Sequence, residues 1–132
     1  MDLIGVISEA ISALPEGPYT RGLNAVAIHI EAALNHLQRG QKTGDTSAYT
    51  DAIYRCNQAF EGSIKEVYRV LSGKDPESIS IFDIESYLDD GQVLKARVLT
   101  QFKRYRKEWR NPSTHDYTLN FDENEAFLAT VN

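Results

Sequence analysis

Apolar residues recur at intervals of three and four along almost the whole 132-residue chain, and this periodicity is the feature that most constrains the fold. The clearest run covers 47–72, where the apolar positions step by 4, 3, 4, 4, 3 and 4 residues at Tyr49, Ile53, Cys56, Phe60, Ile64, Val67 and Leu71. Such spacing places apolar side chains on one face of an α-helix, whereas a half-buried strand alternates at two. We therefore predict an all-α fold, a four- to five-helix up-and-down bundle.

Glycine, proline and capping residues predict where these helices begin and end. The second helix is expected to end at Gly40 before the polar loop QKTGDT, and Ser80 is a candidate cap for the fourth. Pro112 disfavours helical geometry at the residue before it, so Arg110 is expected to be the last residue of the helix over 92–110, called the basic helix below because of its charge. The predicted helices cover about 2–14, 21–39, 47–72, 81–90, 92–110 and from 123 onward. We expect 47–72 and 92–110 to form the central antiparallel pair.

Length and composition favour one soluble domain over 1–132, either the whole protein or part of a longer one. The 42% hydrophobic and 25% charged residues are typical of a globular protein. No apolar run approaches the roughly 18 residues of a membrane span, and the N-terminus MDLIGVISEAISAL lacks the basic region of a signal peptide. We therefore expect a cytoplasmic protein without a membrane partner. The single Cys56 agrees, since it cannot form an internal disulfide.

The charge of the chain is distributed unevenly. The formal net charge is −5, yet the sixteen residues from Lys95 to Arg110 hold seven basic residues and one acid, a local net of +6. On a helical projection Lys103, Arg106 and Arg110 share one edge beside the core face. Two interpretations stay open: a phosphate backbone docks on these cations, or they are a solvated helix face suited to the helix dipole. The candidate RNA-binding residues are Lys103, Arg104, Arg106 and Lys107.

The segment after this helix carries residues suited to RNA cleavage. His115 follows Arg110 by five positions, across the turn Asn-Pro-Ser-Thr, and such a turn can hold a guanidinium and an imidazole within a few ångströms of each other. Cleavage of an RNA phosphodiester needs an imidazole that moves protons near neutral pH and a permanently charged bidentate donor for the phosphorane. The sequence therefore predicts a site that requires no metal and no cofactor.

These residues resemble the HEPN domain family. Arg110-Asn111-Pro112-Ser113-Thr114-His115 fits the Arg-x(4–6)-His signature of that family, and Tyr117 extends it to the Arg-x4-His-x-Tyr form of HEPN toxins. The resemblance covers roughly residues 20–130. It implies that His115 is the general acid or base, Arg110 the phosphate and transition-state ligand, and Asn111 a polar positioning group. Tyr117 would be an auxiliary residue.

The resemblance also implies a function and partners. Members with an intact motif are commonly metal-independent endoribonucleases of toxin–antitoxin, abortive-infection and other antiviral systems. They usually form homodimers in which two motifs face one cleft, and in some toxin pairs the tyrosine at this place is the target of a nucleotidyltransferase antitoxin. RNA, a second copy and an antitoxin are thus the expected partners. The alternative is a HEPN-fold module without activity that binds RNA, a nucleotide or a partner protein.

Further residues allow two readings each. Asn57 and Glu61 are four apart beside the apolar stripe of 47–72, so Glu61 either orients Arg110 or His115 or pairs with Lys65 on the same helix. His29 and His36 are seven apart, about 10.5 Å along a helix, which is too far for one metal ion. Trp109 and Tyr105 lie on the core edge of the basic helix, where packing is expected in place of base stacking.

Overall fold

The computed structural model describes residues 3–91, 96–112, 121, 125–126 and 129–130, and every regular element within them is helical. This confirms the predicted all-α class. The elements are α1 (Leu3–Ser12), α2 (Thr20–Thr43), α3 (Ser47–Ser72), α4 (Ile81–Gly91), α5 (Ala96–Tyr105) and the π-helical turn η1 (Arg106–Arg110). Residues 125–126 and 129–130 are also helical, as expected for the last helix.

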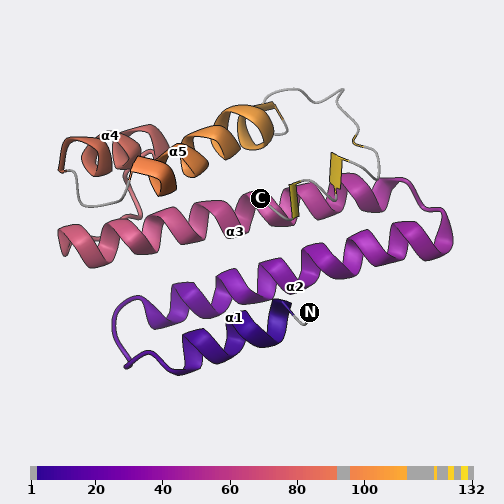
Figure 1. Ribbon diagram of the computed structural model, residues 1–132, viewed down its shortest axis with the longest axis horizontal. Helices are drawn as coiled ribbons and strands as arrows, with labels where there is room; N and C mark the ends of the chain where they lie inside the picture. The colour runs from indigo at the N-terminus through magenta and orange to yellow at the C-terminus, as the bar shows by residue number, and fades with distance from the viewer. Residues whose placement is uncertain (1–2, 92–95, 113–120, 122–124, 127–128, 131–132) are drawn as a thin grey trace.

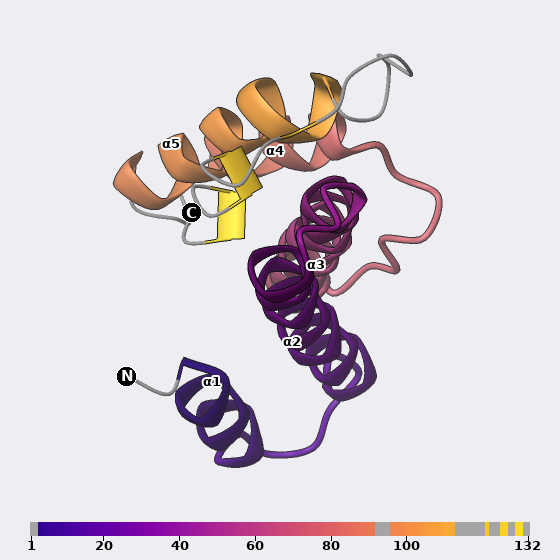
Figure 2. The same cartoon turned by 90° about the vertical axis from the view of Figure 1, so that its right-hand side faces the viewer.

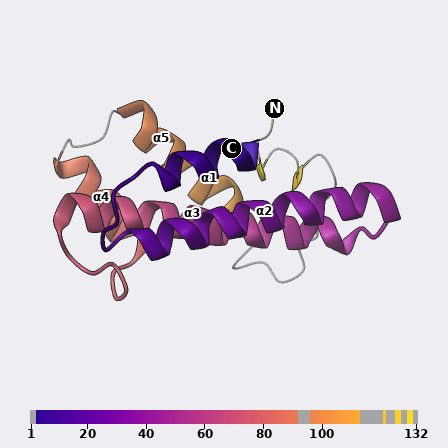
Figure 3. The ribbon, with the colours of Figure 1, turned by 90° about the horizontal axis from the view of Figure 1, so that it is seen from below.

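The long helices α2 and α3 lie antiparallel at the centre of the molecule (Figure 1). Helix α1 lies along the first half of α2 (Figure 3), while α4 and α5 cover the side of α3 (Figure 2). The expectation that 47–72 pairs centrally with 92–110 is wrong, because the most extensive contact of α3 is with α2. The 24 residues of α2 match the 26 of α3 in length, whereas α5 has only 10.

The core is built on the apolar stripe of α3. Ile53 and Ile64 have no exposed surface, and neither have Ile84 and Leu88 of α4. Helix α5 packs against this core through its aromatic side chains. The ring centroid of Phe60 lies 4.9 Å from that of Tyr105 and 5.9 Å from that of Phe102. Such contacts are more specific than aliphatic packing, since ring pairs favour offset and tilted geometries.

The spacing of apolar residues in 92–110 also predicts a core edge at Leu94, Val98, Phe102, Tyr105 and Trp109. Two of the positions expected in the core, one on α3 and one on α5, are exposed. Leu71 and Val98 are each 39% exposed, and the buried neighbours Tyr68 and Leu99 take their places. Leu94, the first expected core residue of this stretch, lies outside the described residues.

Gly40 does not end α2, in contrast to the sequence-based expectation. The helix continues through Gln41–Thr43 and ends at Gly44, whose left-handed φ of 73° lets its N–H donate to the carbonyl of Gly40 at 3.0 Å. Gly40 is buried, and a Cβ there would lie 2.5 Å from Cε1 of Tyr49. The absence of a side chain thus permits close approach of α3.

The helix ends around the α3–α4 connection agree with the predictions. Helix α3 has the predicted bounds, and Gly73 ends it with a φ of 71°. The hydroxyl of Ser80 accepts the N–H of Asp83 at 3.1 Å, the expected cap of α4.

Of the described helices, none combines the length and apolar character that a bilayer crossing needs.

Candidate nucleic-acid interface

The basic helix does not stop before Pro112. The N–H of Asn111 donates to the carbonyl of Arg106, five residues back, and Asn111 and Pro112 remain helical. The expectation that Arg110 is the last helical residue is therefore wrong. A proline ring in an α-helix clashes with the carbonyl four residues before it and lacks a hydrogen to donate. The wider turn of η1 offers a physical reason why this helix accommodates Pro112, and π-turns are frequent at functional sites.

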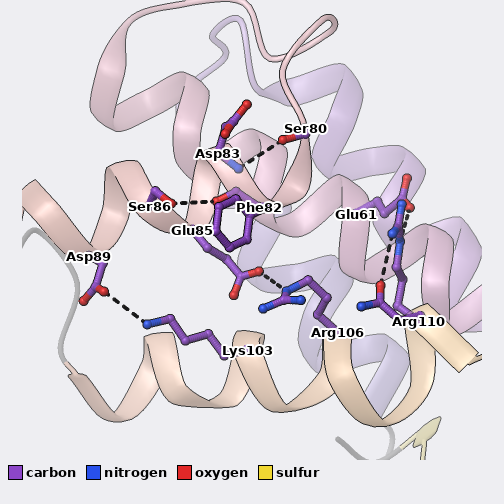
Figure 4. Close-up of polar contacts among 11 residues, drawn as sticks. Glu61, Ser80, Phe82, Asp83, Glu85, Ser86, Asp89, Lys103, Arg106 and Arg110 are labelled. Carbon is purple, nitrogen blue, oxygen red and sulfur yellow. Dashed lines mark hydrogen bonds and ion pairs between the residues drawn. The ribbon is translucent and has the colours of Figure 1, made fainter.

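Arg110 lies at the end of η1, and two described residues contact its guanidinium. Its Nε donates to Oε1 of Glu61 on α3 at 3.0 Å, and its Nη1 donates to Oδ1 of Asn111 at 3.2 Å (Figure 4). The side chains of Arg110 and Glu61 are 25% and 35% exposed, so the pair is reached by solvent. Of the two readings of Glu61, the contact with Arg110 is the one that the structure contains.

Arg106, one turn earlier, pairs with an acid that sequence reasoning missed. Its Nε donates to Oε2 of Glu85 on α4, and its Cζ lies 6.0 Å from the ring centroid of Phe82. Glu85 is 3% exposed, and its other oxygen is buried without a hydrogen-bond partner among the described residues. The signal was present in the sequence: Glu85 shares the apolar face of α4 with Ile84 and Leu88, where a charge needs a partner.

The other cations of the basic helix differ in their surroundings. Lys103 forms an ion pair with Asp89 of α4 at 3.2 Å, with 36% and 61% of the two side chains exposed. Arg104 and Lys107 are exposed on the outer face. Pairs this open contribute little to stability, because water screens them. Lys103 and Arg106 thus join α5 and η1 to α4, whereas Arg110 joins η1 to α3.

Asn57 serves to connect α3 with α5. It is 8% exposed, and its Oδ1 accepts the hydroxyl of Tyr105 at 2.8 Å. Burial raises the pKa of Tyr105 far above its ordinary value, so the hydroxyl stays a donor. Tyr105 and Trp109 are 8% and 9% exposed, which confirms the predicted packing role of both rings.

Two polar clefts adjoin the Glu61–Arg110 pair. One, of about 380 Å³, is bounded by α3, the start of α4 and the end of η1, with residues that include Glu61, Lys65, Phe82, Arg106, Arg110 and Asn111. The second, of about 400 Å³, lies along α2 and α3 and is lined by His36, Asp51, Tyr54, Arg55, Asn57, Gln58 and Glu61. Glu61 lines both, so the clefts meet at the carboxylate that holds Arg110.

The histidines of α2 have separate surroundings. Nδ1 of His29 lies 3.1 Å from Nη1 of Arg55, and burial together with the Arg55 charge lowers the pKa of His29. His36 lines the second cleft. Within the described ranges there is no group of three or more His, Cys, Asp and Glu side chains that would hold a metal ion. His115 and Tyr117, the remaining expected site residues, lie outside those ranges.

Comparisons of the chain with protein families, curated proteins and solved structures found no match.

Proposed function

We propose that this protein is a metal-independent endoribonuclease of HEPN type that acts as a toxin or as an antiviral, abortive-infection effector. The observation that carries the proposal is the Glu61–Arg110–Asn111 contact. Glu61 of α3, itself partly exposed, orients a partly exposed guanidinium at the end of the basic helix, beside a cleft that also contains Lys65 and Arg106. A cation held in place before the substrate binds is the arrangement that stabilises charge developing on a phosphorane.

In the proposed reaction His115 transfers protons and Arg110 binds the phosphate. Glu61 and Asn111 are positioning residues, because each contacts the guanidinium and neither needs to contact RNA. Asn57 supports the site through the α3–α5 contact. Lys103, Arg104, Arg106 and Lys107 provide the surrounding positive charge, so we expect RNA affinity to decrease steeply as salt concentration rises.

We further propose that the active form is a homodimer. In-line cleavage needs a base at the attacking oxygen and an acid at the leaving oxygen, on opposite sides of the phosphorus, and one motif supplies a single imidazole. A twofold axis near η1 would supply the second, since an isologous interface repeats each group across the cleft. The proposed location is the cytoplasm, with an antitoxin as the regulatory partner and Tyr117 as a candidate for nucleotidylation by a nucleotidyltransferase.

One observation favours the non-catalytic alternative. Lys103, Arg106 and Arg110 each already have a carboxylate partner, so the edge that the sequence marked for phosphate is partly neutralised. A HEPN-fold module that binds RNA, a nucleotide or a protein without cleaving it would be compatible with such pairing. The two proposals differ in whether RNA is cut.

The decisive experiment incubates purified protein with single-stranded RNA in the presence of a chelator and follows the fragments by gel electrophoresis. We expect His115→Ala to lower the cleavage rate about 10²- to 10⁴-fold and Arg110→Ala about 10²- to 10³-fold. Lys42→Ala removes an exposed cation at the end of α2 and should leave the rate unchanged. Intact RNA with wild-type protein, at concentrations where it binds, would favour the non-catalytic module.

A mixing experiment tests the shared site. In a heterodimer of Arg110→Ala and His115→Ala protomers, one Arg110 and one His115 from different chains would still face the cleft. We expect the mixture to cleave faster than either variant alone, because only the heterodimer holds both an imidazole and an Arg110 guanidinium, and more slowly than wild type, because it holds a single imidazole. A strict monomer by light scattering, with or without RNA, would contradict the composite site.

A further inference from the structure

Two exposed aromatic side chains line the clefts on either side of the Glu61–Arg110 pair. Phe82 of α4 is 64% exposed and Tyr54 of α3 is 46% exposed. Among the described residues, the other exposed large hydrophobic side chains are aliphatic: Val6, Leu14, Ile28, Val70, Leu71 and Val98. Both exposed rings therefore belong to the candidate site, one to each cleft.

The position of Phe82 combines an open ring with a fixed cation. The Cζ atom of Arg106 lies 6.0 Å from the ring centroid, and the Arg106 side chain is only 17% exposed. In Figure 4 the ring lies between the first turn of α4 and the Arg106–Glu85 pair. A base stacked on the outer side of this ring would have its phosphate near the cleft that contains Arg106 and Arg110.

Tyr54 lies in the second cleft, the one along α2 and α3. It precedes Glu61 by seven residues on α3, two helical turns, which separates them by about 10.5 Å along the axis. A strand with a rise of about 3.4 Å per stacked nucleotide covers that length in about three nucleotides. A single strand that follows both clefts would thus pass from Tyr54 to the Glu61–Arg110 pair in about three nucleotides and would meet Phe82 in the cleft beyond that pair.

The charges along this path suit a strand of phosphates. The two clefts together are lined by the cations Arg55, Lys65, Arg106 and Arg110 and by the carboxylates of Asp51 and Glu61. Asp51 is paired with Arg39 at 2.9 Å, and Glu61 with Arg110 at 3.0 Å. Arg106 is likewise paired with Glu85, so the excess of positive charge along the path comes from Arg55 and Lys65, and the path has a ring at each end.

We propose that Phe82 and Tyr54 are base-stacking residues that bind unpaired nucleotides on either side of Arg110. The proposal rests on the proposed function for its ligand, RNA, and adds that the bound stretch is single-stranded, since a base must leave its neighbours to stack on an isolated ring. Each ring contributes through its π face, so the contact tolerates different bases.

The test measures the binding of fluorescein-labelled 2′-O-methyl oligouridine, which resists cleavage at its protected 2′-positions, by fluorescence anisotropy at one salt concentration. Phe82→Leu and Tyr54→Leu keep an apolar side chain and remove the ring, whereas Phe82→Tyr and Tyr54→Phe keep the ring. Val70→Ala, on a 59% exposed side chain that lines neither cleft, is the control. A duplex of the same length is measured beside the single strand.

We expect each leucine variant to weaken single-strand binding about tenfold, which corresponds to about 1.4 kcal/mol. The ring-keeping variants and Val70→Ala should stay within about twofold of the wild type, and duplex binding should not change among the variants. Equal single-strand affinity of the leucine variants and wild type would overturn the proposal. Equal losses for single strand and duplex, or no RNA binding by wild type, would overturn it as well.

Two further outcomes separate this proposal from the ribonuclease function. If cleavage depends on His115 but RNA affinity does not change when either ring is removed, the ribonuclease function is retained and the stacking role is rejected. Ring-dependent binding without any cleavage would retain the stacking role and reject the enzyme. Light scattering of each variant completes the test, because a change of oligomeric state in Phe82→Leu would assign this ring to a protein interface and overturn its role in RNA binding.

Discussion

The two halves of the molecule each bury a glutamate, and they do so differently. In the α2–α3 half, Glu66 is 7% exposed and pairs with Arg69 three residues later on the same helix, at 3.0 Å. In the α4–α5–η1 layer, Glu85 is 3% exposed and pairs with Arg106, which is 21 residues away on another element. The first pair forms as soon as α3 forms, whereas the second requires two helices to dock.

This difference separates a scaffold from a site. The α2–α3 half contains close steric contacts, such as Gly22 against Glu66 and Gly40 against Tyr49. The α4–α5–η1 layer is attached to α3 by aromatic rings and by the Glu61–Arg110 ion pair, and within the layer one oxygen of Glu85 is buried without a partner among the described residues. Polar groups held between elements can change partners when a ligand binds, so the layer is the half suited to binding.

The largest expected effect breaks the interhelical pair. Arg106→Ala leaves the Glu85 carboxylate buried and unpaired, and we expect the free energy of unfolding to decrease by about 3 kcal/mol. Arg69→Ala should lower it by only about 1 kcal/mol, because the Arg69 side chain is 30% exposed and no oxygen of Glu66 is both buried and unpartnered in the described part of the chain. Urea denaturation measures both.

The double variant Arg106→Met/Glu85→Leu is the control for this first prediction. Replacement of a buried ion pair by apolar side chains of similar volume is often neutral, so its stability should be close to that of wild type. Equal losses for Arg106→Ala and Arg69→Ala would contradict the distinction between the two halves.

The second effect tests the steric character of the α2–α3 half. Gly40→Val places a side chain where Cε1 of Tyr49 lies 2.5 Å from the ideal Cβ position, and we expect a loss of about 2 kcal/mol. Gly44→Ala, with open space around its Cβ but a φ of 73°, should lose about 1 kcal/mol through backbone strain alone. Thermal unfolding compares the stabilities of the two variants. An unchanged stability of Gly40→Val would show that the contact between Gly40 and Tyr49 has room for a side chain.

The third effect probes the hydrogen bond that joins the halves. Tyr105→Phe removes the donor to Asn57 from a buried site, and we expect a loss of about 1 kcal/mol. Tyr87→Phe removes an exposed bond to the carbonyl of Leu71 at 3.2 Å and should have a smaller effect. If Asn57 acts in cleavage without a structural role, Tyr105→Phe would change the rate at unchanged stability.

The smallest effect is a pH dependence in α2. Burial, and secondly the charge of Arg55, lower the pKa of His29 in the folded protein below the ordinary value of 6.5. The unfolded chain therefore binds the proton first, so stability is full above about 6.5 and decreases as the pH falls toward the folded pKa. His29→Gln should flatten the stability profile over that range. An identical slope in the variant would assign it to other groups.

The sequence by itself determined the helices, because helix formation depends on neighbours three and four residues apart. The periodicity of α3, the left-handed Gly73 and the Ser80 cap are all such local signals. For Glu61 the sequence left two readings open, and the structure contains the contact with Arg110. The roles expected for His115 and Tyr117 stay predictions.

Only the tertiary structure decided which helices pair and which charges meet. The apolar stripe on α3 does not specify whether α2 or α5 packs against it. In the folded protein α2 makes the more extensive contact, because its 24 residues extend along the length of α3, whereas α5 has only 10. Gly40 packs closely against Tyr49 and does not end α2. This role exists only because α3 lies across from Gly40 in the folded protein. The partner of Arg106 likewise results from docking, since local spacing contains no information about residues brought together by another element.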